Sequence, residues 1–255
     1  MNENHPVMKN AEEFYFAGND VGVLISHGFT GTTQSMFDVG KRIAEEGYTV
    51  LGPRLTGHGT HPEDMERATY KNWIADVEAG LEKVKESCST IFVVGLSMGG
   101  TLALYLAENH PEITGIVPIN AATSMPELGK NFNDLQAVDI RFVDGIGSDI
   151  KMEGVEELAY PQTPVKAMGE ILSLMEIVRG NLKNITAPAL IFSSIVDHVV
   201  PPENSTEIYN GISSEQKSFV QMENSYHVAT LDNDKELIAE KCIQFIREQV
   251  KCVST

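Results

Sequence analysis

The segment that most constrains the fold is the pentapeptide Gly-Leu-Ser-Met-Gly at 95–99, because it joins a strand pattern to a helical pattern. Residues 90–94 are mostly β-branched or apolar, as in a buried strand, and residues 101–108 have the composition of a helix. A turn this tight forces its serine into a strained backbone conformation that points the hydroxyl out of the sheet. Small residues two positions before and after Ser97 let the strand and the helix approach each other. The pattern predicts a nucleophilic serine at the end of a strand.

Short apolar runs alternate with helical patterns along the chain, which is typical of βαβ units and a parallel sheet. The strand patterns cover 21–25, 48–51, 90–94, 113–119, 189–193 and 217–222, and the principal helical patterns cover 36–44, 70–86, 101–108 and 235–250. This rhythm stops between 121 and 185, a stretch too long for a structureless loop in a compact domain. We therefore predict an α/β core formed by 1–120 and 186–255, with 121–185 inserted as a cap (lid) over one end of the sheet.

Charge and composition exclude several classes of function. The chain has 36 acidic residues against 19 lysines and arginines, a net charge of -17, which disfavours binding to nucleic acid or to anionic membrane surfaces. We see no signal peptide, and the apolar runs are far shorter than the ~20 residues of a membrane span. Three cysteines without CxxC spacing favour neither a disulfide framework nor a metal site. These observations predict a cytoplasmic protein without stable membrane insertion.

Five motifs together resemble those of the α/β-hydrolase superfamily. They are HGFTG at 27–31, GHG at 57–59, GLSMGG at 95–100, DHVVP at 197–201 and NSYHV at 224–228. Within the superfamily the chain is most similar to bacterial monoacylglycerol lipases and to small thermostable carboxylesterases, and the resemblance covers nearly all 255 residues. It implies an α/β-hydrolase fold, in which helices flank a mostly parallel central sheet that carries an inserted cap. It also implies that no cofactor is needed.

The candidate catalytic triad is Ser97, Asp197 and His227, because each follows a predicted strand in the chain order typical of this fold. Ser97 would attack the acyl carbonyl, His227 would take the serine proton and return it to the leaving alcohol, and Asp197 would fix the imidazole tautomer. Taken alone, Asp197 could be an ordinary turn residue and His227 a surface histidine, but their joint order favours the triad. The competing residues lie in the wrong loop or follow the histidine: His198, Asp232 and Asp234.

The resemblance also assigns an oxyanion hole. In the family, the residue after the His-Gly pair and the residue after the serine each donate a backbone N–H, which here are Phe29 and Met98. We expect His27 to be structural rather than catalytic. His58 and His61, three residues apart and near acidic residues, could suggest a metal site, but no third soft ligand stands nearby in the sequence. We therefore expect no bound metal.

The predicted cap contains apolar residues, most of which must form its own core, while a minority can line an acyl tunnel. Its segments GIGSD at 145–149 and ELAY at 157–160 resemble those of bacterial monoacylglycerol lipases. That resemblance implies that Glu157 accepts hydrogen bonds from the glycerol head and that Ile146 shapes the alcohol pocket. A solvated helix face is the alternative interpretation of Glu157.

The sequence therefore predicts a serine esterase that hydrolyses monoacylglycerol to fatty acid and glycerol through an acyl-Ser97 intermediate. Its partner is a small lipid ester, and the protein is a monomer or a homodimer. One alternative is a broad short-to-medium-chain carboxylesterase that uses the same residues. The other is a non-catalytic ligand receptor on a hydrolase scaffold, because fold alone does not fix function.

Overall fold

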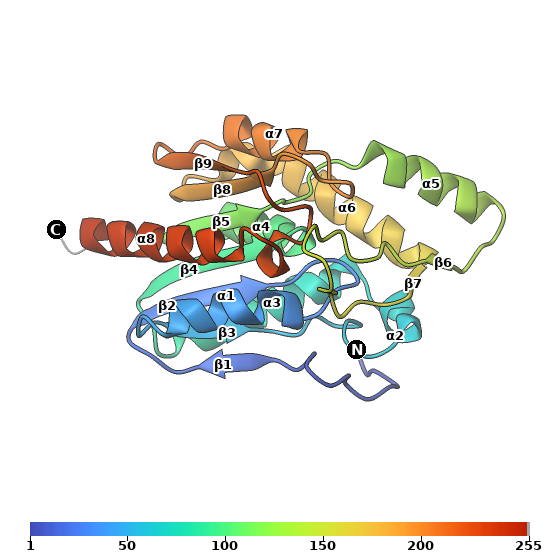
Figure 1. Ribbon diagram of the computed structural model, residues 1–255, viewed down its shortest axis with the longest axis horizontal. Helices are drawn as coiled ribbons and strands as arrows, with labels where there is room; N and C mark the ends of the chain where they lie inside the picture. The colour runs from blue at the N-terminus through green and yellow to red at the C-terminus, as the bar shows by residue number, and fades with distance from the viewer. Residues whose placement is uncertain (254–255) are drawn as a thin grey trace.

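The computed structural model describes residues 1–253 and is built around a seven-stranded sheet (Figure 1). The strands of this sheet, in spatial order, are β1 (Phe14–Phe16), β3 (Thr49–Gly52), β2 (Val21–Ser26), β4 (Thr90–Leu96), β5 (Gly115–Ile119), β8 (Ala189–Ser194) and β9 (Lys217–Met222). Every neighbouring pair is parallel except β1 with β3. A second sheet pairs β6 (Phe142–Asp144) with β7 (Gln162–Pro164) in antiparallel fashion. The predicted fold class, a mostly parallel sheet flanked by helices, is confirmed.

The central strands are buried on both faces, which explains why their sequences are continuous apolar runs rather than alternating patterns. Their register also sets where a site can form. Ser26 of β2 pairs with Gly95 of β4, Leu96 pairs with Ile119 of β5, and Ile119 pairs with Phe192 of β8. The carboxyl ends of these four strands are therefore level, and the loops that follow them meet at one edge of the sheet.

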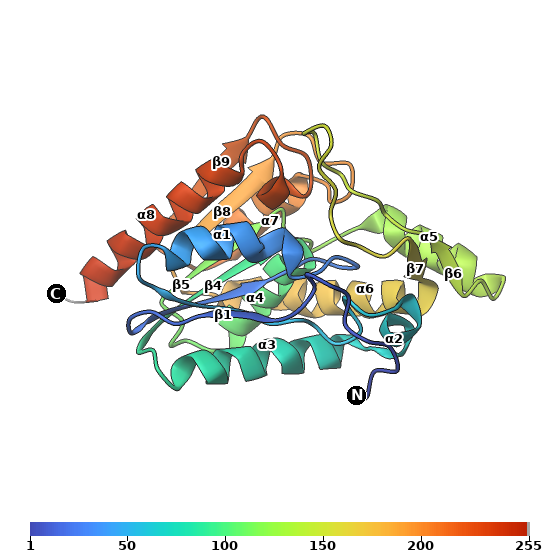
Figure 2. The same cartoon turned by 60° about the horizontal axis from the view of Figure 1, so that its bottom comes forward.

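Helices cover both faces of the sheet (Figure 2). One face carries α1 (Gln34–Ala44) and α8 (Lys235–Val253), and the other carries α3 (Tyr70–Lys85) and α4 (Met98–Asn109). Each face has its own cluster of buried apolar side chains. The shorter helices are α2 (Pro62–Arg67) and α7 (Glu203–Gly211), with single 3₁₀ turns at Leu182–Asn184 and Ala229–Leu231. Within residues 1–253, no helix combines the length and the apolar character that crossing a membrane requires.

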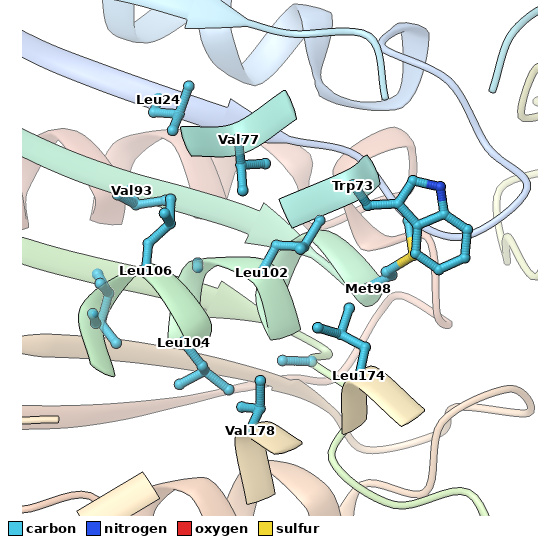
Figure 3. Close-up of a cluster of buried hydrophobic side chains, with 14 of the residues drawn as sticks. Leu24, Trp73, Val77, Val93, Met98, Leu102, Leu104, Leu106, Leu174 and Val178 are labelled. Atoms are coloured by element: carbon cyan, nitrogen blue, oxygen red, sulfur yellow. The ribbon is translucent and has the colours of Figure 1, made fainter. Parts of the chain in front are cut away.

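Residues 121–185, called the insertion below, leave the sheet after β5 and return to it before β8. They form α5 (Pro126–Ala137), the β6–β7 pair and α6 (Val165–Asn181), and α5 and the β6–β7 pair lie beyond the carboxyl ends of the strands (Figures 1 and 2). The α5 helix buries none of its residues fully and packs against α6, where the Phe132 ring lies over Gly169. In contrast, α6 joins the larger core cluster: its Val178 lies beside Leu104 of α4, and its Leu174 points toward Met98 at the start of α4 (Figure 3).

The predicted strands and principal helices are all present, with boundaries that differ by a few residues. The strand predicted over 113–119 begins two residues later, because β5 starts at Gly115. The prediction did not include β1, α2, α7 or the β6–β7 pair. Apart from α7, these elements have only three to six residues each, which is too short for a hydrophobic period to be recognised. The α7 helix has nine residues but buries only one apolar side chain, Ile208, so it has no apolar stripe.

Candidate active site

Ser97 lies in the turn between β4 and α4, with φ 55° and ψ -119°. Few residues other than glycine adopt this strained combination. The backbone around this turn leaves no room for side chains, so only glycine fits on either side of Ser97. A Cβ at Gly95 would lie 2.0 Å from the Gly99 carbonyl oxygen, and a Cβ at Gly99 would lie 2.2 Å from the Ser26 carbonyl oxygen. The predicted elbow is thus present, and its serine lines a pocket.

His227 and Asp197 form a buried acid–base pair. The Nδ1 atom of His227 lies 2.7 Å from Oδ2 of Asp197, and the two side chains are 8% and 2% exposed. The other carboxylate oxygen of Asp197 accepts the N–H groups of Val199 at 2.9 Å and Val200 at 2.8 Å, which fixes the carboxylate in place. Because the Asp197 oxygen accepts this hydrogen bond, the neutral form of His227 carries its proton on Nδ1 and has its lone pair on Nε2. His227 and Ser97 line the same pocket, as a nucleophile and its base must.

The charges around His227 favour its protonated form. Burial by itself would lower its pKa, but the carboxylates of Asp197, Glu157 and Asp149 and the hydrogen bond to Asp197 outweigh burial. The net result is a pKa above the ordinary value of 6.5. An imidazolium formed during reaction would therefore be stabilised where it stands.

Asn120, which is not among the residues predicted from the sequence, follows β5 and holds the histidine loop. Its Nδ2 donates to the His227 carbonyl oxygen at 2.8 Å and to Ser194 Oγ at 3.0 Å, and its Oδ1 accepts the Ser194 N–H at 2.8 Å. Its φ is 44°, a region in which asparagine is enriched among non-glycine residues. An asparagine directly after an apolar strand was the available signal.

Of the candidate oxyanion donors, Phe29 lies in the turn that passes Ser97, and Met98 directly follows Ser97 in the chain. The turn after β2 passes next to the serine, because a Cβ at Gly28 would lie 3.3 Å from Ser97 Cβ. Phe29 follows in this turn and lines the pocket, while its ring packs edge-on against Trp73 with 6.0 Å between centroids. Met98 is the first residue of α4, so its N–H has no acceptor within the helix. The positive end of the helix dipole also points here.

The histidines of the HGFTG and GHG motifs have structural surroundings. Burial lowers the pKa of His27 to about 4 and that of His58 well below its ordinary value, so both are neutral and packed inside the protein. His61 instead lies at the surface, where its Nδ1 caps α2 by accepting the Glu63 N–H at 3.2 Å. Within residues 1–253, one group could hold a metal ion, formed by His5, His61 and Glu63, and none of the three lines the pocket.

The pocket over Ser97 combines core loops with the insertion. The core supplies Gly28, Phe29, Thr30, Leu96, Val199, His227 and Val228 beside the serine. The insertion supplies mostly apolar residues and one carboxylate: Ala122, Met125, Leu128, Ile146, Gly147, Ile171 and Glu157. The structure thus brings both substrate-binding candidates, Ile146 and Glu157, to the same pocket as the candidate triad.

Glu157 is the only one of these insertion residues with an ionisable side chain. An added Cβ at Gly31 would lie only 2.3 Å from Glu157 Oε1, so the carboxyl group packs directly against the glycine backbone. Burial raises the pKa of Glu157 to about 7, although nearby His227 and a hydrogen bond from Ser35 oppose the rise. Its backbone is held as well, because the N–H donates to Ser148 Oγ at 2.9 Å. A solvated helix face, the alternative interpretation, does not describe this position.

The competing residues have other roles. Asp232 accepts the backbone N–H groups of Lys151 and Tyr226, at 2.7 and 2.9 Å, and Asp234 accepts that of Asn224 at 2.9 Å. The ring of His198 is 58% exposed and pairs with a different carboxylate.

Comparison with known proteins identifies the family. The family model described as serine aminopeptidase, S33, matches residues 19–234. A thermostable monoacylglycerol lipase from Bacillus sp. (strain H-257) is 51% identical over 245 residues, covering 96% of this chain and 98% of the relative. A carboxylesterase from Bacillus subtilis (strain 168) is 30% identical over 236 residues, covering 92% of this chain and 96% of the relative.

Solved structures agree with this result. A structure from a study of LipS and LipT, two metagenome-derived lipolytic enzymes, superposes with a TM-score of 0.92 at 48% identity, covering 95% of this chain and 100% of the other. The monoacylglycerol lipase of Paleococcus ferrophilus shares the fold, with a TM-score of 0.77 at 16% identity over 93% of this chain and 98% of the other. The protein belongs to the S33 serine aminopeptidase family and is a serine hydrolase of the α/β-hydrolase superfamily.

Proposed function

We propose that this protein hydrolyses monoacylglycerol to fatty acid and glycerol. The observation that carries the proposal is the half-buried Glu157, whose carboxyl group is the one ionisable group that the insertion contributes to the pocket of Ser97 and His227. A carboxyl group that is partly withdrawn from water needs hydrogen-bond donors, and the hydroxyl groups of a glycerol head supply them. The relative that is 51% identical is named for the same activity.

In the proposed mechanism, His227 Nε2 takes the proton of Ser97 Oγ as that oxygen attacks the ester carbonyl carbon. The backbone N–H groups of Phe29 and Met98 hold the oxyanion that forms. Collapse of the intermediate breaks the bond to the glycerol oxygen, which receives the proton from the His227 imidazolium. His227 then deprotonates a water molecule, which attacks the acyl-serine ester. As the bond between the acyl carbon and Ser97 Oγ breaks, the His227 imidazolium gives its proton to Oγ, which releases the fatty acid and restores Ser97.

The insertion acts in this proposal as the cap that selects the substrate. Its apolar residues Met125, Leu128 and Ile171 contact the acyl chain, and Ile146 packs against the glycerol head while Glu157 accepts its hydroxyl groups. A pocket with one carboxyl group suits one short polar head, so monoacylglycerol fits it better than triacylglycerol, whose other two acyl chains would occupy the polar side.

The test compares initial rates on a monoacylglycerol, the matching diacylglycerol and triacylglycerol, and the methyl ester of the same acid, with Ser97→Ala as the blank. We expect a preference for monoacylglycerol and a loss of several orders of magnitude in Ser97→Ala. At pH 8, where Glu157 is ionised and His227 is mostly neutral, Glu157→Gln should lower kcat/KM for monoacylglycerol about 3- to 10-fold, because the amide oxygen still accepts a hydrogen bond but without the charge, and should leave the methyl ester nearly unchanged.

Two results would contradict the proposal. Equal or faster turnover of the methyl ester, with no effect of Glu157→Gln, would favour a broad carboxylesterase, the activity named for the 30% identical relative. Absence of turnover on every ester would favour a ligand receptor, and labelling of Ser97 by a fluorophosphonate would then show whether the serine is reactive at all.

A further inference from the structure

Asp149, a residue of the insertion, contacts both loops of the acid–base pair. Its Oδ2 accepts the backbone N–H of His227 at 3.1 Å and that of His198 at 3.0 Å. Its Oδ1 lies 2.8 Å from Nδ1 of His198, and its backbone oxygen accepts the N–H of Val228 at 3.1 Å. The carboxylate is only 14% exposed. One side chain therefore ties the histidine loop to the loop that carries Asp197.

A second carboxylate, on the core, also binds the insertion to the core. Asp232, in the core, accepts the N–H groups of Lys151 at 2.7 Å and Met152 at 2.9 Å, both in the insertion, and that of Tyr226 at 2.9 Å. Asp149 of the insertion thus accepts N–H groups of the core, and Asp232 of the core accepts N–H groups of the insertion. Because five of the donors are backbone N–H groups, the contact fixes main-chain positions rather than flexible side chains.

We propose that Asp149 is a positioning residue for the general base, which holds the His227 backbone in place and stabilises the His227 imidazolium by its charge. The proposal rests on the assignment of His227 as the base. Three carboxyl groups face this imidazole, Asp197 from the loop after β8 and Asp149 and Glu157 from the insertion. Asp149 itself faces the exposed ring of His198.

The placement of Asp149 couples substrate selection to catalysis. The residues just before it, Ile146 and Gly147, line the pocket, and Ser148 Oγ accepts the N–H of Glu157. Four consecutive residues thus contact the substrate pocket, the glycerol-binding candidate and the general base. A substrate that displaces this wall would also displace the base, so a poor fit of the alcohol lowers turnover as well as affinity.

Two substitutions separate the effect of the Asp149 hydrogen bonds from the effect of its charge. Asp149→Asn keeps the shape: its amide oxygen can accept from His227 and His198, and its amide N–H can donate to His198 Nδ1, so only the charge is lost. Asp149→Ala removes the charge and every hydrogen bond of the side chain. The matched control is Asp144→Asn, which removes the same charge from an exposed residue of the insertion. The substrate is p-nitrophenyl butyrate, which has no glycerol head for Glu157 to bind.

We expect Asp149→Ala to lower kcat about 10- to 100-fold with little change in KM, as a misplaced base would. Asp149→Asn should recover most of kcat but move the acidic limb of the kcat/KM profile about half to one pH unit lower, because His227 loses a stabilising charge. Asp144→Asn should match the wild type in both. A merely structural role would not move the acidic limb.

Wild-type kcat in a folded Asp149→Ala protein would overturn the proposal. If Asp149→Ala does not fold, an Asp149→Asn profile that coincides with the wild type would overturn it. Failure of the assigned triad has a different signature, since Ser97→Ala would then retain activity on p-nitrophenyl butyrate whatever residue 149 is.

Discussion

Replacing Asn120 by alanine tests whether one buried side chain keeps the catalytic base aligned with the sheet. The side chain makes three hydrogen bonds of 2.8 to 3.0 Å, two to Ser194 and one to the His227 carbonyl oxygen. The residue is 3% exposed, so water cannot replace these partners without a local rearrangement.

The expected loss of stability follows from these contacts. Each hydrogen bond contributes about 1 kcal/mol net, and leaving the Ser194 N–H buried without an acceptor costs about 1–3 kcal/mol more. The φ of 44° adds about 1 kcal/mol for alanine. We expect a total of about 5–7 kcal/mol, which for a chain of this size lowers the melting temperature by roughly 10–28 °C.

The assay is calorimetric unfolding together with kcat on p-nitrophenyl butyrate below the melting transition. We expect kcat to fall about tenfold, because the His227 carbonyl loses its anchor. The control is Asn109→Ala, an asparagine at the end of α4 with one exposed hydrogen bond to the Tyr105 carbonyl oxygen, which should change stability by at most about 0.5 kcal/mol. A destabilisation by Asn120→Ala of under about 1 kcal/mol would refute this reasoning.

Three further predictions concern the elbow and the two titrating groups. Gly99→Ala should prevent normal folding, since its Cβ would lie 2.2 Å from the Ser26 carbonyl oxygen, and a wild-type melting temperature would contradict this. The kcat/KM of the wild type on a simple ester should fall at acidic pH with a limb above pH 6.5, because only neutral His227 is a base and its pKa is raised; a limb well below 6.5 would argue against it. Glu157→Gln should raise the melting temperature more at pH 8 than at pH 5. Between pH 4.5 and about 7 the folded protein holds a Glu157 proton that the unfolded chain has lost, so wild-type stability falls as pH rises through this window. Equal differences at the two pH values would be inconsistent with a buried carboxyl group.

The parallel sheet and the candidate triad could be predicted because their signals are local. A strand that is buried on both faces is a continuous apolar run, and Ser97, Asp197 and His227 each follow such a run or a strand pattern at a fixed place in the chain order. The glycines of the elbow, which have no side chain, then let β4 and α4 pack closely. None of these inferences requires knowledge of which distant segments touch.

Asn120 and Asp149 could not be found in this way. Their partners are largely backbone N–H and carbonyl groups of other loops, and every residue type carries those groups. The sequence of a loop therefore does not record that its backbone is held by a side chain some 80 or 110 residues away, as His227 is held by these two.

The packing of α6 on α4 has a consequence for synthesis of the chain on the ribosome. The apolar face of α4 around Leu104 is covered by Val178 of α6, which is made about 70 residues later (Figure 3). At a synthesis rate of about 5–20 residues per second, this face of α4 stays uncovered for on the order of 4–14 seconds. The strands β8 and β9, whose following loops carry Asp197 and His227, emerge later still. The nascent protein thus displays an elbow and a bare helix before it has an acid, a base or a completed sheet, and this is the interval in which a chaperone would protect it from aggregation.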